Sequence, residues 1–171
     1  MVFRNPVRRV DAPGVAGERE ALTSWLDWHR ATLLTKLDGL ADEPLRRIVL
    51  PSGLSLLGIV KHLTEVEQGW FALDFAGYDE PEIYAEDDDP DAAFRVGPAE
   101  SAEDIVAAYL RMCDRSRKIV AEAESLEIAV PNARRGSVDL RWILIHLIEE
   151  TARHNGHADA IRELIDGSVG D

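Results

Sequence analysis

The sequence is poor in cysteine, in long apolar runs and in positive charge. Its one cysteine, Cys113, cannot form a disulfide within the chain, so disulfide bonds play no part in the expected fold. No apolar run is long enough to cross a bilayer, and the first residues lack the apolar segment of a secretion signal. We therefore expect a cytoplasmic protein without a membrane partner.

The shortage of positive charge also limits the choice of partners. The chain carries 19 lysines and arginines against 32 aspartates and glutamates, which gives a net charge of −13. Such a chain repels the phosphate backbone of nucleic acids, and its basic residues do not gather into a useful patch. The charge balance therefore argues against nucleic-acid binding and favours a small-molecule substrate.

The length and the apolar content fit one domain of ordinary size. Hydrophobic residues make up 46% of the 171 residues, which is enough to build a core. We expect a single domain over residues 1–171, in which residues 1–16 form a flexible N-terminal arm.

Apolar residues recur at spacings of three and four, which predicts long amphipathic helices. Ser101 and Asp104 resemble a capping box at the start of one helix, and Gly167 is well placed to end another. No segment gives a convincing strand pattern. The sequence thus predicts an all-α, up-down four-helix bundle, with helices at about 18–38, 55–77, 101–120 and 139–164.

Eight acidic residues lie between Asp79 and Asp91, after the second predicted helix. They suggest a calcium loop, with Asp87, Asp89 and Asp91 at alternate positions. The sixth position of such a loop should be glycine and the twelfth glutamate, but the chain has Ala92 and Pro98 there. A solvated acidic loop is therefore the better interpretation.

The last predicted helix carries four polar residues on one side. His146, Glu150, His154 and His157 fall within about 80° of one another around the helix axis, beside apolar neighbours. Burying imidazoles and a carboxylate is costly unless something satisfies them, and a metal ion would do so. Ligands four residues apart on a helix can share an ion, but the spacing alone leaves several combinations open.

Two more histidines could join this cluster. His62 lies among apolar residues of the second predicted helix, and His29, beside Trp25 and Trp28, could line the same cavity or only cap the edge of the core. A lone histidine on an apolar face is more often hydrogen-bonded than ligating.

The glutamates of the last helix also have a structural interpretation. Glu149 and Glu150 could form ion pairs with Arg153 or Arg162 on the same helix. That interpretation suits Glu149 better than Glu150.

Two segments, SGLSLLGIVKHLTEVEQGWF and RWILIHLIEETARHNGHADAIRELIDG, resemble the DinB-like metal-binding four-helix bundle superfamily, in particular its actinobacterial branch of unknown function. The resemblance implies one metal ion held by His62, Glu150 and His154. Mycothiol-dependent maleylpyruvate isomerases are similar in having a glutamate at the place of Glu150. His157 stands where glutamine is usual in the superfamily.

Three protein ligands leave a position open for water or substrate, which is typical of catalytic sites. Zinc is the expected ion, and nickel, iron or manganese would also suit two nitrogen ligands and a carboxylate. The resemblance implies a metal-dependent S-transferase or isomerase that acts on a small molecule with a low-molecular-weight thiol, such as mycothiol or bacillithiol, as cosubstrate.

Other residues can be given roles in this reaction. His157 or His29 would position or deprotonate the second substrate, and Arg95 and Arg141 would bind carboxylates of the thiol or substrate. For each arginine, however, the sequence favours an ordinary surface or salt-bridge role.

Two alternatives stay open. One is metal-assisted hydrolysis with Glu149 or His157 as general base. The other is a non-catalytic metal-binding bundle that could act as a homodimer.

Overall fold

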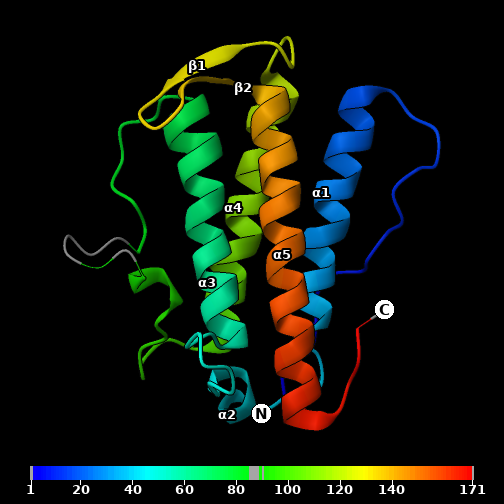
Figure 1. The fold of residues 1–171 in the computed structure, drawn as a ribbon, viewed down its shortest axis with the longest axis vertical. Coiled ribbons are helices and arrows are strands. Elements are labelled where there is room, and N and C mark those ends of the chain that lie inside the picture. The colour runs from blue at the N-terminus through cyan, green and yellow to red at the C-terminus, as the bar shows by residue number, and fades with distance from the viewer. Residues whose placement is uncertain (1, 85–88, 90, 171) are drawn as a thin grey trace.

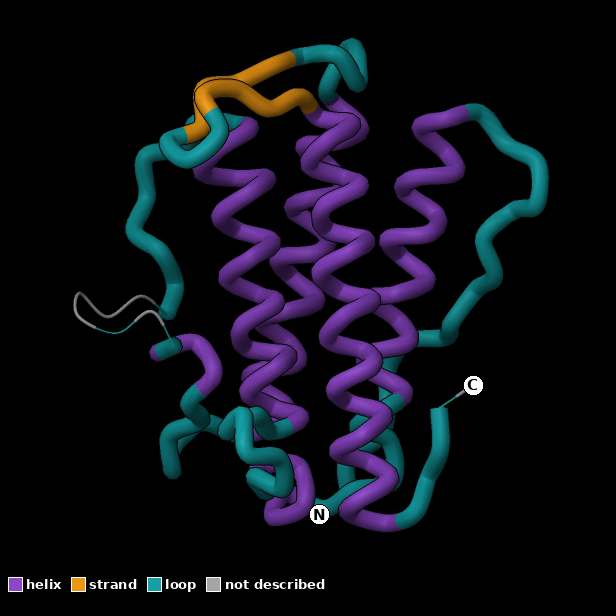
Figure 2. The backbone as a smooth tube through the Cα atoms, in the orientation of Figure 1, coloured by secondary structure: helices purple, strands orange, loops and turns teal. Residues whose placement is uncertain are grey.

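The computed structural model describes residues 2–84, 89 and 91–170, and it is mostly helical, as the sequence predicts. Four long helices lie side by side, with a short helix near one end and a pair of strands across the other (Figures 1 and 2). The helical elements are α1 (Glu18–Thr35), α2 (Asp42–Arg46), α3 (Leu56–Glu67), the π-helical η1 (Gln68–Phe75), the 3₁₀ turn η2 (Ala92–Phe94), α4 (Ala102–Glu122) and α5 (Leu140–Asp166).

Side-chain caps explain where several of these helices begin, and a glycine explains where α5 ends. The Ser55 hydroxyl accepts a hydrogen bond from the Gly58 amide, and the Asp139 carboxylate accepts one from the Trp142 amide. At α4 the Ser101 hydroxyl accepts from the Asp104 amide and donates to the Asp104 carboxylate, so the predicted start is confirmed. Gly167 ends α5 with a φ of 78°, a left-handed conformation that favours glycine.

The expectation of a wholly α-helical chain is wrong in one respect, because strands β1 (Ala129–Asn132) and β2 (Gly136–Asp139) form an antiparallel hairpin. Asn132 accepts hydrogen bonds from the amides of Arg134 and Arg135 in the turn, and Gly136 has a φ of 76°. Strands of four residues are too short to show a periodic pattern. The turn residues were therefore the only local indication of a hairpin in the sequence.

The start of the predicted N-terminal arm contacts the loop that follows α1. Phe3 is buried, its amide donates to the Leu40 carbonyl, and its carbonyl accepts from the Gly39 amide.

Across the described part of the chain, no helix has both the length and the apolar character needed to cross a membrane.

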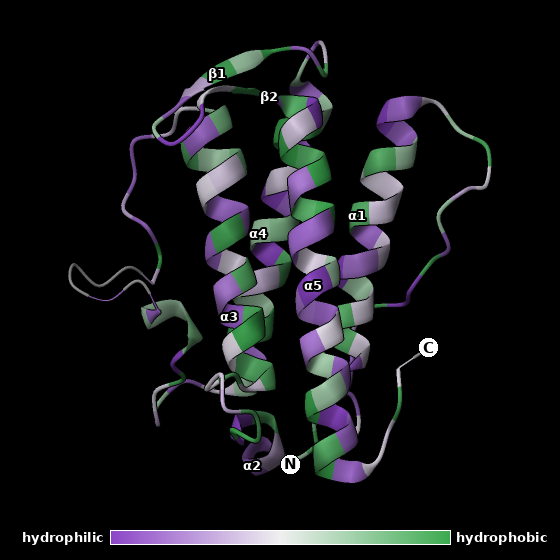
Figure 3. Ribbon diagram, viewed as in Figure 1, coloured by the Kyte–Doolittle hydropathy of each residue, from purple (hydrophilic) through white to green (hydrophobic). Residues whose placement is uncertain are grey.

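The core consists of two apolar clusters, and a buried ion pair lies where they meet. In Figure 3 the long helices carry both hydrophobic and hydrophilic residues, as amphipathic helices do. Along α1, Arg30 comes between Leu26 of one cluster and Leu33 of the other. Its guanidinium binds both oxygens of Glu67 on α3, at 2.7 and 2.6 Å, and both side chains are almost completely buried.

Glu67→Gln should lower the free energy of unfolding by about 3 kcal/mol, because it removes the buried counter-ion of Arg30 and leaves only the more exposed Asp27, which Arg30 shares with Arg117. Urea denaturation followed by circular dichroism measures this loss. The matched control is Glu43→Gln, which removes an exposed ion pair with Arg47 and should leave the midpoint nearly unchanged. Equal midpoints for the two variants would contradict a stabilising role of the buried pair.

Candidate metal centre

Three residues from two helices form a group that could hold a metal ion. His62 comes from α3, while Glu150 and His154 lie one turn apart on α5, and one ligand atom from each lies within 4.8 Å of the others. These are the three residues that the superfamily resemblance implies. The structure thus brings the expected group together, and metal binding by it stays a prediction.

The two distances from Glu150 to the histidines suit a shared ion better than ordinary hydrogen bonds. One oxygen of Glu150, Oε1, lies 3.4 Å from Nε2 of His62 and 3.2 Å from Nε2 of His154. Hydrogen bonds of this kind usually span about 2.9 Å. Two ligand atoms about 2.0–2.1 Å from a tetrahedral ion lie about 3.3–3.4 Å apart. Two imidazole nitrogens and a carboxylate also match zinc in chemical type, so the residues present fit a divalent ion.

The charge of Glu150 is favoured by its neighbours. Hydrogen bonding to His154, and then to His62, holds the pKa of the Glu150 carboxyl well below its ordinary range, although burial opposes this. The Glu150 and His62 side chains are 17% and 20% exposed, whereas His154 is 7% exposed. The group therefore lies at the edge of the core, and solvent reaches it from the side of His62 and Glu150.

One imidazole nitrogen of the group has no hydrogen-bond partner among the described residues. It is Nδ1 of His154, which is buried. A ligating imidazole normally donates this second nitrogen's proton to an outer acceptor. No such acceptor is supplied within the described part of the chain.

Phe94 forms one wall of the group, and the sequence alone did not identify it. Its ring stacks on His62 with centroids 4.0 Å apart and lies 5.8 Å from the ring of His154. A side chain at Gly58, one turn before His62, would overlap the main-chain oxygen of Phe94. A glycine inside a helix was the available signal, since such a position often marks a close approach of another backbone.

The two other histidines on this side of α5, His146 and His157, are not members of the three-residue group. His146 lies between Trp70 and Trp142, and its Nδ1 is 3.6 Å from Glu149, so it does not join the three-residue group. Burial lowers the pKa of His146. The ring of His157 lies 5.4 Å from that of His154, and its pKa is lowered by burial and then by His154. Of these two, only His157 contacts a member of the group.

His29 lies next to this region on α1. Its main-chain oxygen accepts a hydrogen bond of 3.1 Å from the amide nitrogen of Asn155, the residue after His154. The His29 ring packs against Trp25 and Trp28, and burial lowers its pKa. Among the described residues, His29 is linked to the group through Asn155 and does not belong to the three-residue cluster.

The two expected carboxylate-binding arginines are both engaged in ion pairs. Arg95 follows Phe94 in the chain, is exposed, and pairs with Asp89. Arg141 pairs with Glu18 at 2.6 Å and stands nine residues before Glu150, about 13 Å along α5. The structure therefore brings Arg95 near the group and leaves Arg141 at the far end of the helix.

The contacts of Glu149 and of the acidic loop bear on two predictions from the sequence. Glu149 forms an ion pair with Arg153 on the exposed side of α5, as expected for that glutamate. Of the rejected calcium loop, Asp87 lies outside the described residues, and Asp89 is paired with Arg95.

A comparison with protein families gives an independent result. A family model described as mycothiol-S-transferase matches residues 21–167, a range that contains all three members of the group. No curated protein matches the chain.

We expect the protein to bind one zinc ion, and His62→Ala and Glu150→Gln each to weaken that binding at least about 100-fold, because each removes a ligand. Elemental analysis and competition with a chelator measure occupancy and affinity. Glu149→Gln and His146→Ala are the controls from the same helix and should bind zinc normally. Full occupancy in both ligand variants would refute this ligand set.

Gly58→Ala should weaken zinc binding about tenfold and cost about 1–3 kcal/mol of stability, because the added methyl group displaces Phe94 from His62. Zinc titration and urea denaturation report the two effects. Gly69→Ala is the matched control, since a side chain there meets nothing within 4 Å. An unchanged zinc affinity in Gly58→Ala would show that Phe94 does not support the group.

Proposed function

Because this chain belongs to the mycothiol-S-transferase family, we propose that it is a metal-dependent enzyme that transfers a low-molecular-weight thiol to a small electrophile. Mycothiol is the thiol that the family indicates, and bacillithiol is a chemically related candidate. The observation that carries the proposal is the His62, Glu150 and His154 group inside the matched range.

In this proposal His62, Glu150 and His154 hold one divalent ion, with zinc as the first choice and nickel, iron or manganese as alternatives. When bound, such an ion lowers the pKa of a coordinated thiol, so that the thiolate is present near neutral pH. The ionised Glu150 supports a cation at this place. The partial exposure of His62 and Glu150 leaves a side from which a thiol can approach.

Neighbouring residues complete the proposed site. Burial lowers the pKa of His157, which favours its neutral imidazole, and the neutral form can accept the proton of the thiol. His29 is a second candidate for positioning the acceptor, through its contact with Asn155. Arg95 is better placed than Arg141 to bind an anionic group, because it follows the ring that stacks on His62.

The proposal extends to the architecture. We take the four long helices to form an up-down four-helix bundle and residues 1–171 to be one domain, as the superfamily resemblance implies. A homodimer and a cytoplasmic location stay predictions from the sequence.

The contacts of Glu149 weaken one form of the hydrolase alternative. Glu149 is engaged by Arg153 and His146, so it is a poor general base for a water at the three-residue group. His157 would have to serve instead, and an assay can separate the two reactions.

The test is conjugation of mycothiol to 1-chloro-2,4-dinitrobenzene by the zinc-loaded protein. The thiolate sulfur forms a bond to the ring carbon, chloride leaves, and the thiol proton passes to His157 and from there to buffer. We expect chelation or His62→Ala to lower the rate at least about 100-fold, because both remove the ion that favours the thiolate. Glu149→Gln, the control, should keep the rate within about twofold.

Other outcomes decide between the alternatives. Conjugation that persists after zinc has been removed would refute the metal-dependent mechanism. Hydrolysis of activated esters without thiol would favour the hydrolase, and the absence of both reactions would favour a non-catalytic metal-binding protein.

A further inference from the structure

A cavity of about 650 Å³ lies between α1 and α4, and no member of the candidate metal centre lines it. Its volume is within the range of about 300–1,000 Å³ found for small-molecule sites. Apolar side chains form its floor, and Leu26, Val120 and Leu144 are all buried there. The cavity therefore offers an apolar surface that is separate from the proposed zinc group.

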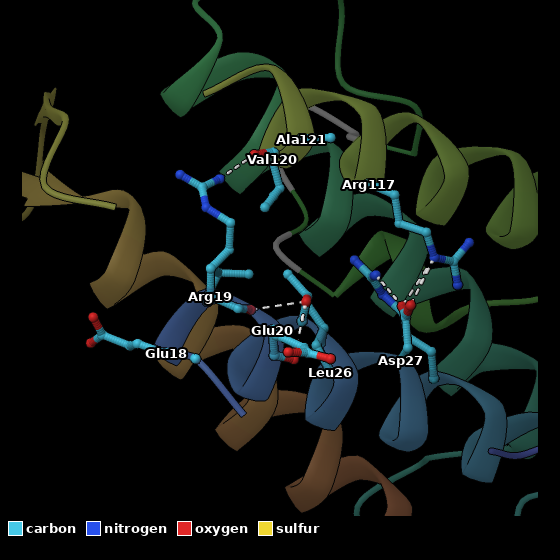
Figure 4. A pocket seen from close by; sticks show the side chains of 12 residues that line it. Glu18, Arg19, Glu20, Leu26, Asp27, Arg117, Val120 and Ala121 are labelled. Carbon is cyan, nitrogen blue, oxygen red and sulfur yellow. Dashed lines mark hydrogen bonds and ion pairs between the residues drawn. The ribbon is translucent and has the colours of Figure 1, made fainter. Parts of the chain in front are cut away.

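Two arginine bridges, one from each helix, frame this cavity (Figure 4). Arg19 of α1 reaches α4, where its two terminal nitrogens donate to the carbonyl oxygens of Val120 at 2.6 Å and Ala123 at 2.9 Å. Arg117 of α4 reaches back to Asp27 of α1 at 3.0 Å. Along α1 the bridges are eight residues apart, about 12 Å. The space between them suits a slender apolar molecule.

The two bridges differ in charge balance. Asp27 neutralises Arg117 and also accepts a hydrogen bond from Arg30. Arg19 contacts two carbonyl oxygens and, among the described residues, forms no ion pair with a carboxylate. A guanidinium that has only neutral partners, at the mouth of an apolar cavity, is suited to an anionic group.

We propose that this cavity binds a small amphipathic monocarboxylate. Its apolar body lies on Leu26, Val120 and Leu144, and its carboxylate pairs with Arg19. Two exposed glutamates also line the cavity: Glu18, which pairs with Arg141, and Glu20. Glu20 opposes a negative ligand and therefore lowers its affinity. The inference does not depend on the proposed transferase activity.

Isothermal titration calorimetry of the full chain with octanoate, 1-octanol and octylammonium tests this proposal. We expect octanoate to bind most tightly. Arg19→Gln should weaken octanoate binding about fivefold and leave octanol binding within about twofold, because only the carboxylate uses the guanidinium. Arg19→Lys should retain most of the octanoate affinity, and Glu20→Gln should increase it.

Further variants test whether the ligand occupies the cavity itself. Ala121→Phe, which fills the mouth, should abolish binding of both ligands, while Arg47→Gln, an exposed arginine elsewhere, should have no effect. His62→Ala should bind octanoate normally, so loss of the metal centre and loss of this site are distinguishable.

Three results would overturn the proposal. Octanol binding as tightly as octanoate would remove the role of Arg19. Unchanged octanoate binding in Ala121→Phe would place the ligand elsewhere. Sedimentation showing a dimer that Ala121→Phe dissociates would assign this face to a second copy of the chain.

Discussion

The buried ion pair between Arg30 of α1 and Glu67 of α3 constrains the orientation of both helices. Burial alone would lower the pKa of Arg30, but the Glu67 carboxylate beside it raises that pKa well above its usual value, so the guanidinium stays charged. A charge in the core is tolerated only when its partner holds a fixed geometry, here two short bonds. Asp27, which Arg30 shares with Arg117, extends the constraint to α4.

The same helix, α3, presents the first ligand of the candidate metal centre. His62 and Glu67 are five residues apart, which places them about 140° from each other around the helix axis. When Glu67 faces α1, His62 therefore faces a different neighbour, and it meets Glu150 of α5. The close approach of Phe94 at Gly58 covers the His62 ring on another side. The ion pair in the core and the metal group at its edge thus depend on one helix orientation.

The sequence predicted the starts of α3, α4 and α5 well because capping residues mark them. Ser55, Ser101 and Asp139 each accept an amide hydrogen bond at a helix start, and these residue types are visible without a structure. The hairpin was missed because its strands are four residues long. Its only local signals were Asn132 and Gly136 in the turn.

The candidate site was predicted less completely, for a geometric reason. Periodicity shows which residues share one side of a helix, but it does not show which neighbour each of them meets. His146 and Glu150 share a side of α5, yet His146 meets Trp70 of η1 while Glu150 meets His62 of α3. The family resemblance supplied His62, and neither source indicated Phe94, because its contact with His62 joins segments far apart in sequence.

The two proposed sites can coexist because α5 presents different sides to them. Leu144, on the floor of the cavity, and Glu150 are six residues apart, about 120° around the axis of α5. Three arginines and the three carboxylates of Glu18, Glu20 and Asp27 line the cavity, so its lining is neutral overall, whereas the whole chain has a net charge of −13. Asp27 and Glu67 neutralise Arg30 and Arg117, which leaves Arg19 as the cation with neutral partners at that rim. An anion that approaches this otherwise repulsive protein would therefore be held best where Arg19 crosses from α1 to α4.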